Sequence, residues 1–335
     1  MLNKKVIIRV DGNSSIGLGH LYRGIALAEI LKERYNIEFV TKISTTISPI
    51  KESGFSLTYI PSTVSFSEEP IWIKNNYVTD SIIVLDGYEF TEYYQQKIKK
   101  FNFKLVYIDD FAKGIQKADL VINHSPNAQK SNYKCEYYTK LALGLEYALL
   151  RKRFINFDRN KIKSKNKIET IFISFGGADT HDFTHKSAQA LLKISSIKKI
   201  NIVLGAAYKN KAVLEIRSPK IHIHNNLQEQ NIFNLMKDTD LAITSASTTS
   251  IELASLGTPM ILGYFTDNQI GIYNGFINKK AVKPIGDLKK YNFENLFEEI
   301  TNIKKEGLLN ILQTKTLMLF NGKIDDNIRN KFKKL

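Results

Sequence analysis

The hydrophobic pattern of the first thirty residues predicts a buried strand, a polar loop and a helix. The strand is expected from Lys5 to Val10, and the loop between Asp11 and His20 is polar and rich in glycine. Apolar side chains then recur at helical spacing, at Ile25, Leu27, Ala28 and Leu31. A helix N-terminus after a glycine-rich loop has free backbone N–H groups that attract electron-rich ligands, so this segment predicts a ligand site.

Further apolar runs alternate with turn and helix patterns along the whole chain, which predicts an α/β fold. Strands are expected at 37–40, 57–60, 81–87, 104–110, 120–123, 170–175, 200–205 and 221–226, with one ending at Thr244 and one following Pro259. Helices are expected at 292–303 and 307–320, and 61–77 is expected to be irregular.

Two domains are expected because 335 residues exceed one ordinary core. We predict an N-terminal domain over 1–160, a C-terminal domain over 168–320 and a C-terminal helix over 321–335 that returns to the first domain. The lysine-rich segment 161–167 lacks apolar periodicity and is expected to be the linker.

The composition narrows the class of protein. A formal charge of +15 suits nucleic acid, a membrane surface or an anionic substrate, but the lysines are spread along the chain and no nucleic-acid motif gathers them. The single cysteine, Cys135, excludes an internal disulfide, and no apolar run reaches 18 residues. We therefore expect a cytoplasmic protein with a small anionic substrate, no nucleic-acid partner and no stable membrane association. We also expect a monomer without a cofactor or a metal, although composition does not decide the oligomeric state.

His20 is the candidate for chemistry in the first loop. The loop is not a dinucleotide fingerprint, because Tyr22 stands where the third glycine belongs, and it lacks the Gly-Lys-Ser/Thr of a phosphate-binding P-loop. An imidazole at a helix start is held neutral by the helix dipole and can act as a general base near pH 7. A capping or packed histidine is the alternative.

Acidic and polar residues follow several strands at their carboxyl ends, the edge where open α/β sheets bind ligands. They are Asp86, the neighbours Asp109 and Asp110, and the loop from His124 to Asn127. Asp109 and Asp110 are adjacent on an extended chain and should point to opposite sides.

In the second half, Gly176-Gly177 follows a strand and precedes a helix, and a hydroxyl-rich run from Thr244 to Ser250 does the same. Such a run at a helix start can cradle a phosphate without a lysine, and Glu252, one turn later, could accept hydrogen bonds from both ribose hydroxyls. A tight turn and an ordinary serine N-cap are the alternatives.

Several of these motifs resemble the pseudaminic-acid-pathway nucleotide-sugar hydrolases and their spore-coat-polysaccharide relatives. The likeness covers nearly the whole chain, with gaps near 61–76 and 278–292. It lies in the segments Arg9–Gly12, Ile16–His20, Arg23–Ala28, Asp119–Asn123, Leu143–Arg151, Ser174–Asp179, Asp240–Leu262, Asp267–Gln269 and Phe320–Lys323. One departure is Ala246-Ser247, where the family usually has two glycines, and side chains there are expected to narrow the approach to the diphosphate.

The resemblance implies a GT-B architecture, in which two Rossmann-like domains face each other across a cleft. It also implies inverting, metal-independent hydrolysis of a UDP-linked 2,4-diacetamido-2,4,6-trideoxy sugar, with His20 as the base. The substrate-binding residues would be Asp11, Gly17, Gly19, Arg23, Asp86, Asn268 and Gln269. The nucleotide-binding residues would be Gly176, Gly177, Gly205, Asn226, Leu227, Ser247, Thr248, Thr249 and Glu252. A GT-B glycosyltransferase with a nucleotide-sugar donor and a non-catalytic nucleotide-sugar-binding protein are the alternatives.

Overall fold

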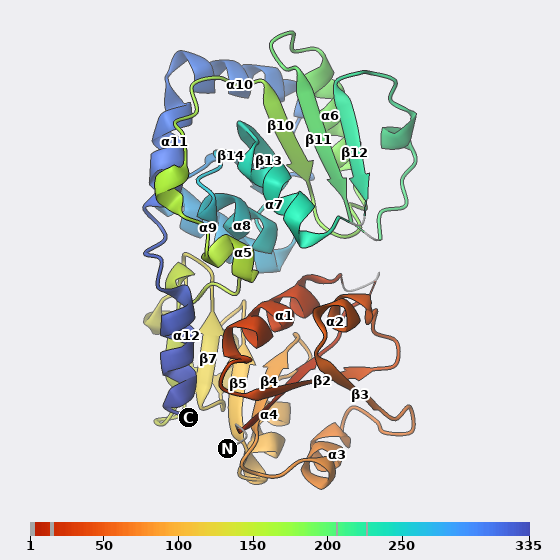
Figure 1. The fold of residues 1–335 in the computed structure, drawn as a ribbon, viewed down its shortest axis with the longest axis vertical. Helices are drawn as coiled ribbons and strands as arrows, with labels where there is room; N and C mark the ends of the chain where they lie inside the picture. Colours follow the sequence, from red (N-terminus) through yellow and green to blue (C-terminus); the bar gives the residue numbers. More distant parts are fainter. Residues whose placement is uncertain (1–3, 14–16, 206, 226) are drawn as a thin grey trace. The chain divides into compact units, whose positions relative to one another are not determined.

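The computed structural model describes residues 4–13, 17–205, 207–225 and 227–335, which form two compact units. Unit 1 runs to Lys152 and includes Lys323–Leu335, and unit 2 is Arg153–Gly322. In Figure 1, unit 1 is coloured red to yellow with α12 in dark blue, and unit 2 is green to blue. Each unit is an α/β domain built on one main sheet of parallel strands.

Unit 1 has a seven-stranded sheet in the order β3-β2-β1-β4-β5-β7-β9. Its strands are β1 Lys5–Val10, β2 Asn36–Lys42, β3 Ser56–Ile60, β4 Ile82–Asp86, β5 Lys104–Ile108, β7 Leu120–Asn123 and β9 Lys140–Leu143, with a small separate pair β6 Ile115–Gln116 and β8 Lys134–Cys135. Its helices are α1 Gly19–Leu31, α2 Ser48–Ser53, α3 Glu69–Asn76, α4 Glu92–Lys100 and α12 Ile324–Lys333, with short 3-10 turns at Lys130–Asn132 and Leu145–Tyr147.

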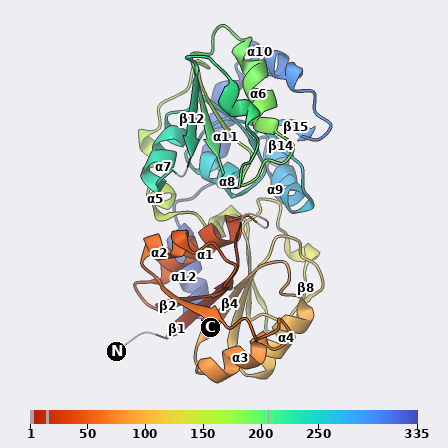
Figure 2. The ribbon, with the colours of Figure 1, turned by 90° about the vertical axis from the view of Figure 1, so that its right-hand side faces the viewer.

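The two faces of the unit 1 sheet are covered by different helices, as Figure 2 shows. Ile7, Ile83 and Leu85 pack with residues of α3 and α4 in one apolar cluster. On the other face α1 lies so close that a side chain at Gly24 would come within 3.3 Å of Ile8. Because both faces are buried, the central strands are continuous apolar runs rather than alternating ones.

Unit 2 has a six-stranded sheet in the order β12-β11-β10-β13-β14-β15. Its strands are β10 Thr170–Ser174, β11 Lys199–Leu204, β12 Ile221–Asn225, β13 Leu241–Ser245, β14 Met260–Tyr264 and β15 Lys283–Asp287. Its helices are α5 Lys152–Ile155, whose first residue is the last of unit 1 before the boundary, α6 Phe183–Leu192, α7 Glu229–Lys237, α8 Thr248–Ser255, α9 Asp267–Asn278, α10 Leu296–Lys305 and α11 Leu308–Leu317, with 3-10 turns at Arg159–Lys161, Ala212–Glu215 and Phe293–Asn295.

The chain passes between the units at Lys152–Arg153 and again at Gly322–Lys323. The sequence places the first boundary at 160 to 168, but this lysine-rich segment is bound within unit 2. Gln313 on α11 accepts from the Lys165 N–H (3.0 Å) and donates to the Lys163 carbonyl (3.1 Å). α12 belongs to unit 1, where Arg329 donates to the Ile30 carbonyl at the end of α1 (2.9 Å).

The segment 61–77 differs from its expected irregular form, because it contains α3. Pro70 stands in the first turn, where its missing N–H costs nothing. Glu69 is fully buried and binds Arg9 of β1 through two hydrogen bonds of 2.9 and 3.0 Å. Arg9, sixty residues earlier in the chain, thus anchors the start of α3, and local periodicity does not reveal such a contact.

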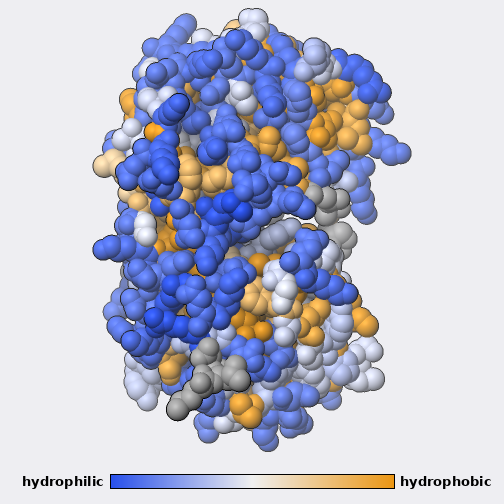
Figure 3. Space-filling model, in the orientation of Figure 1, coloured by the Kyte–Doolittle hydropathy of each residue, from blue (hydrophilic) through white to orange (hydrophobic). Residues whose placement is uncertain are grey.

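None of the helices in the described part of the chain combines the length and apolar character that a membrane crossing needs. Hydrophilic side chains cover most of the face in Figure 3, and the apolar ones on it form small separate areas.

Candidate active site

The described ends of the first loop, 11–13 and 17–20, lie at the point where the strand order of unit 1 reverses. β1 lies between β2 and β4. From β1 the chain adds β2 and β3 on one side of the sheet, and then β4, β5, β7 and β9 on the other side. Val10 at the end of β1 is the register partner of Asp86 at the end of β4. The crevice beside such a reversal is where open α/β sheets bind ligands, and His20, the second residue of α1, lies there.

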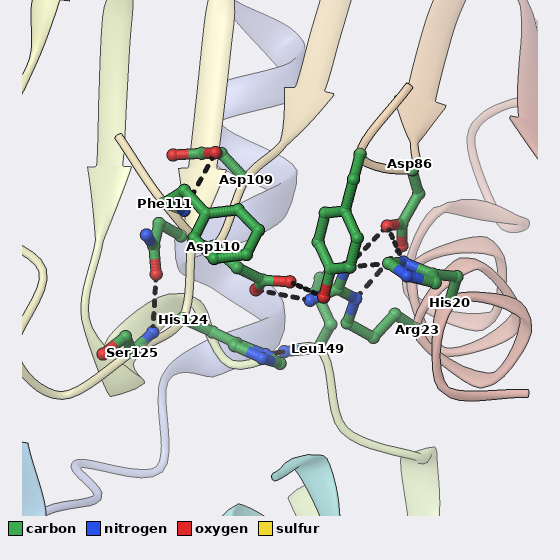
Figure 4. Close-up of polar contacts among 12 residues, drawn as sticks. His20, Arg23, Asp86, Asp109, Asp110, Phe111, His124, Ser125 and Leu149 are labelled. Atoms are coloured by element: carbon green, nitrogen blue, oxygen red, sulfur yellow. Dashed lines mark hydrogen bonds and ion pairs between the residues drawn. The ribbon is translucent and has the colours of Figure 1, made fainter. Parts of the chain in front are cut away.

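The side chains of His20, Arg23, Asp86 and Asp110 meet at this edge (Figure 4). Asp86 Oδ1 lies 2.6 Å from both His20 Nδ1 and Arg23 Nη2, and Asp86 Oδ2 accepts from Arg23 Nε (3.1 Å). Arg23 Nη1 donates to Asp110 Oδ1 (2.6 Å). His20 and Arg23 stand three residues apart on α1 and therefore share one helix face.

These partners decide which nitrogen of His20 carries the proton. Asp86 Oδ1, 2.6 Å from Nδ1, can only accept a hydrogen bond, whereas Arg23 Nη2, 2.9 Å from the same atom, can only donate. The shorter contact with the ionised carboxylate favours the proton on Nδ1. The other nitrogen, Nε2, then has a lone pair that can take a proton. His20 is thus a base whose orientation is held by a buried carboxylate.

Electrostatics keep both carboxylates ionised. Burial by itself would raise the pKa of Asp86, but Arg23 and His20 hold it below the usual range of an aspartate. Burial likewise opposes ionisation of Asp110, and Arg23 again lowers its pKa. The pKa of Arg23 is raised well above its ordinary value, because the two carboxylates outweigh its own burial. The prediction that Arg23 touches substrate is untested, and in this structure its guanidinium joins two carboxylates.

Three residues at this edge are absent from the predicted site. Asp110 completes the ion-pair network, and Tyr88 donates to its Oδ2 (3.0 Å) while its ring meets His20 edge-on at 4.8 Å. His124 follows β7 and is 3% exposed. The sequence did place Asp110 and His124 at the ligand edge, because they follow β5 and β7, but it gave them no role. The position of Tyr88 two residues after β4 is the signal that could have found it.

Asp11, predicted to bind substrate, is engaged inside unit 1. Its Oδ1 accepts from the Lys42 N–H (2.7 Å) and the Thr45 hydroxyl (2.8 Å), and Oδ2 pairs with Arg9 (2.7 Å). These contacts hold the end of β1 against the end of β2.

Gly17 and Gly19 differ in what they require of the backbone. Gly17 has a φ of +84°, which favours glycine, whereas Gly19 does not have a positive φ. A side chain at Gly19 would meet no atom within 4 Å in the described part of the chain. Close approach of a ligand at Gly19 stays a prediction.

Unit 2 repeats the reversal of strand order, here between β10 and β13. Gly176 and Gly177 follow β10 and are exposed, and Gly176 has a φ of +89°. Gly205 at the end of β11 packs against them so closely that a Cβ there would lie 2.4 Å from the Gly177 Cα. The three predicted glycines are therefore together at one sheet edge, and Gly205 has a packing reason to be glycine.

The hydroxyl-rich segment follows β13 at the same reversal and begins α8. The Ser247 N–H donates to Ser250 Oγ (3.1 Å), while Ser247, Thr248 and Thr249 are half-buried. Ala246 is fully buried, so its methyl group lies inside the protein. That Ser247, half-buried beside it, narrows the approach to the diphosphate stays a prediction. Glu252 is 6% exposed, one turn into α8.

The remaining predicted residues also lie in unit 2. Gln269 on α9 is buried, and its Oε1 accepts from the Phe265 N–H (2.9 Å), which closes the turn after β14. Asn268 accepts from the Thr266 hydroxyl (2.7 Å). Leu227 is half-buried just after β12. Asn226 lies outside the described residues.

Among the described residues, no group of three histidine, cysteine or acidic side chains is placed to hold a metal ion. Asp109 and Asp110 turn to different partners, because Asp109 accepts from the Ala112 N–H (2.7 Å) and the Tyr133 hydroxyl (2.7 Å).

Comparison with known proteins identifies distant relatives, although no protein-family model matches the chain. Uncharacterized protein MJ1062 of Methanocaldococcus jannaschii is 30% identical over 306 residues, which are 86% of this chain and 61% of that protein. The UDP-2,4-diacetamido-2,4,6-trideoxy-beta-L-altropyranose hydrolase of Campylobacter jejuni is 27% identical over 258 residues, 72% of this chain and 85% of the hydrolase. Spore coat polysaccharide biosynthesis protein SpsG of Bacillus subtilis is 24% identical over 284 residues, 83% of each chain. The chain thus spans about three fifths of the length of its archaeal relative.

Solved structures confirm the predicted fold. MurG of Acinetobacter baumannii has a TM-score of 0.65 at 13% identity, with 99% of this chain and all of that one covered. The spinosyn forosaminyltransferase SpnP has a TM-score of 0.67 at 8% identity, with 99% and 98% covered. Both are GT-B glycosyltransferases, so the chain has the GT-B fold with two Rossmann-like domains.

Proposed function

We propose that the protein hydrolyses a UDP-linked 2,4-diacetamido-2,4,6-trideoxy sugar to UDP and the free sugar, with His20 as the general base. The observation that carries the proposal is the His20–Asp86 pair, which presents a fixed imidazole at the strand reversal of unit 1. A relative 27% identical over 258 residues bears the name of this activity. The free sugar that the proposed reaction releases would serve nonulosonic acid synthesis for surface glycans, as the sequence resemblance implies.

The leaving group decides what chemistry the protein must supply. A nucleoside diphosphate leaves as a stable anion, so cleavage needs little general acid and no second glycosidase carboxylate. Water attacks the anomeric carbon, the bond from that carbon to the diphosphate oxygen breaks, and its electron pair stays on UDP. The proton of the attacking water passes to His20 Nε2 and then to solvent. General-base assistance of this kind contributes about 10²–10⁴-fold.

Unit 2 would bind the nucleotide at its own strand reversal. Exposed backbone at Gly176 and Gly177 and the start of α8 offer N–H groups to a diphosphate, and Glu252 would accept from the ribose hydroxyls. Asn268 and Gln269 would bind polar groups of the sugar. No step in this scheme requires a cofactor or a metal ion.

The test is release of UDP from this nucleotide sugar without an acceptor, in the presence and absence of EDTA. We expect release by the wild type in both conditions and a loss of about 10²–10⁴-fold in kcat for His20→Ala, with UDP binding retained. His222→Ala, which removes an exposed histidine of β12 in unit 2, is the control and should keep full activity.

A glycosyltransferase is the second candidate, because MurG and SpnP, two of the similar solved structures, are glycosyltransferases. If the wild type binds UDP but releases none from the nucleotide sugar, the hydrolase proposal fails. UDP release that appears only after an acceptor is added would identify a transferase.

A further inference from the structure

His124 is a buried histidine beside the candidate site that the proposed reaction does not use. It follows β7, is 3% exposed, and its Nδ1 accepts from the Leu149 backbone N–H (3.3 Å). Figure 4 shows its imidazole beside the Leu149 backbone, and the charges of Arg23 and Asp110 act on it. The side chain therefore extends toward the cluster that holds His20.

The Leu149 contact fixes the tautomer of His124. Burial, followed by the charge of Arg23, lowers the pKa of His124 to about 4, so the ring is neutral at pH 7. Because Nδ1 accepts a hydrogen bond, the single proton of the neutral ring is on Nε2. His124 thus presents an N–H donor.

That donor has no hydrogen-bond partner within the described residues. An unsatisfied buried donor is unfavourable by about 1–3 kcal/mol, and such groups in folded proteins call for a specific explanation. Replacement by an apolar side chain would remove this cost, so an orphaned donor beside a candidate site points to an acceptor that arrives with a ligand.

The charges around His124 indicate what kind of acceptor fits. Asp86 and Asp110 carry two negative charges, and Arg23 carries one positive charge. Arg23 acts on His124 more strongly than either carboxylate, but both carboxylates oppose it, so the surroundings supply no free positive charge for a phosphate or carboxylate oxygen. An amide carbonyl and a hydroxyl can both accept from an N–H donor. The 2,4-diacetamido sugar of the proposed function carries two acetamido carbonyls, which are uncharged and can only accept, so one of them suits this donor.

We propose that His124 is a substrate-binding residue whose Nε2–H donates a hydrogen bond to an acetamido carbonyl oxygen of the sugar. The identity of the sugar rests on the proposed function. His124 would then select nucleotide sugars that carry an N-acetyl group and would hold the sugar while His20 acts on water.

A direct test follows the ring nitrogens of His124 by NMR. The protein is labelled with ¹⁵N-histidine in the His20→Ala background, so that the UDP-diacetamido-trideoxy sugar is not consumed, and His124 is assigned by its loss in His124→Phe. We expect the Nε2–H tautomer in the free protein and a shift of this signal on addition of the nucleotide sugar, but not of UDP alone. An Nδ1–H tautomer, or an unchanged signal when the nucleotide sugar is bound, would overturn the proposal.

Kinetics provide a second test with matched variants. His124→Phe keeps a flat ring without the donor and should lower kcat/KM about 10–100-fold, mostly through KM, while UDP affinity is unchanged. His124→Gln places an amide N–H near Nε2 and should restore most of the loss. Ser81→Ala removes another buried group that lacks a partner among the described residues, at the opposite end of β4, and should leave KM unchanged.

The two proposals fail in different ways. If the wild type releases no UDP, the hydrolase proposal fails, but a shift of the His124 signal on binding the nucleotide sugar still supports the acetamido contact. If the wild type hydrolyses the substrate and His124→Phe has the same KM, the His124 proposal fails alone.

Discussion

His20 Nδ1 and Asp86 Oδ1 are 2.6 Å apart, although 66 residues separate them in the chain. β1 and β4 pair in parallel with Val10 opposite Asp86, so the loop that leaves β1 and the end of β4 must meet. The contact therefore follows from the strand order. The contact orients His20 and favours its Nδ1–H tautomer, and Arg23 links the same carboxylate to Asp110.

Asp86→Asn should reduce activity by removing the group that orients His20. The side-chain amide of the new asparagine can turn its NH₂ group toward Nδ1 of His20. Nδ1 then accepts a hydrogen bond, the proton moves to Nε2, and Nε2 no longer has the lone pair that a base needs. We expect kcat for UDP release to fall about 10²–10⁴-fold, with UDP binding unchanged. Asp110→Asn is the matched control, because it also alters a partner of Arg23 but leaves the His20–Asp86 contact. Equal losses in the two variants would show that the contact with His20 is not the decisive one.

Arg23→Met should destabilise unit 1, because it leaves two buried carboxylates without their cation. We expect a loss of about 3–5 kcal/mol in the free energy of unfolding at pH 7. Trp72, the single tryptophan, lies in α3 of unit 1, so its fluorescence during urea unfolding reports on this unit.

The pH dependence of the stability loss in Arg23→Met distinguishes unpaired carboxylates from lost packing as its cause. With Arg23 present the pKa values of Asp86 and Asp110 are lowered, so the two residues stabilise the wild type above the ordinary aspartate pKa and lose that effect as the pH falls through their lowered values. Without Arg23, burial favours protonation, and the loss should be smaller at pH 5 than at pH 8. Arg23→Met combined with Asp110→Asn should recover part of the stability. A loss independent of pH, with no recovery in the double variant, would indicate packing instead.

The sequence allowed the two α/β halves and the ligand edges to be predicted, because parallel strands buried on both faces leave long apolar runs that end in polar residues. Asp86 and Gly176-Gly177 were found in this way, and the structure places each set at a strand reversal. The start of α3 was missed because it depends on the buried pair of Arg9 and Glu69, which no local pattern shows.

In the candidate site too, features that depend on neighbouring residues could be predicted, and contacts between residues far apart in the sequence could not. His20 was identified from its place at a helix start. That Arg23 joins Asp86 and Asp110 depends on three strands and a helix meeting at one edge, and so does the burial of His124. The burial of Ala246 could not be predicted either, because the sequence does not show that its methyl group lies inside the protein.

Gly205→Ala should disturb the predicted nucleotide site of unit 2. The new Cβ would lie 2.4 Å from both the Cα and the carbonyl oxygen of Gly177, and backbone atoms at this distance must move. We expect the loops after β10 and β11 to separate and UDP affinity to fall about tenfold or more, in line with the 1–3 kcal/mol cost of overpacking. Isothermal titration with UDP measures this. Gly19→Ala, in unit 1, has no such contact within the described residues and should bind UDP as the wild type does. Unchanged UDP affinity in Gly205→Ala would place the nucleotide away from this edge.

His124 should make unit 1 sensitive to acid between about pH 6.5 and 4. Its pKa is lowered from 6.5 to about 4 by burial and by Arg23, against the opposing charges of Asp110 and Asp86. As the pH falls through this window the unfolded chain gains a proton on this histidine and the folded chain does not, so stability is lost. A shift of this size corresponds to about 3 kcal/mol in the free energy of unfolding.

Urea unfolding followed by Trp72 fluorescence at pH 7.5 and pH 4.5 measures the effect. His124→Phe cannot titrate and should lose less stability between these two pH values than the wild type. His222→Phe alters an exposed histidine in unit 2 and should keep the wild-type difference. If His124→Phe and the wild type lose the same stability on acidification, protonation of His124 does not limit the folded state. The Nε2–H donor would then have to be established from the ring nitrogen signals alone.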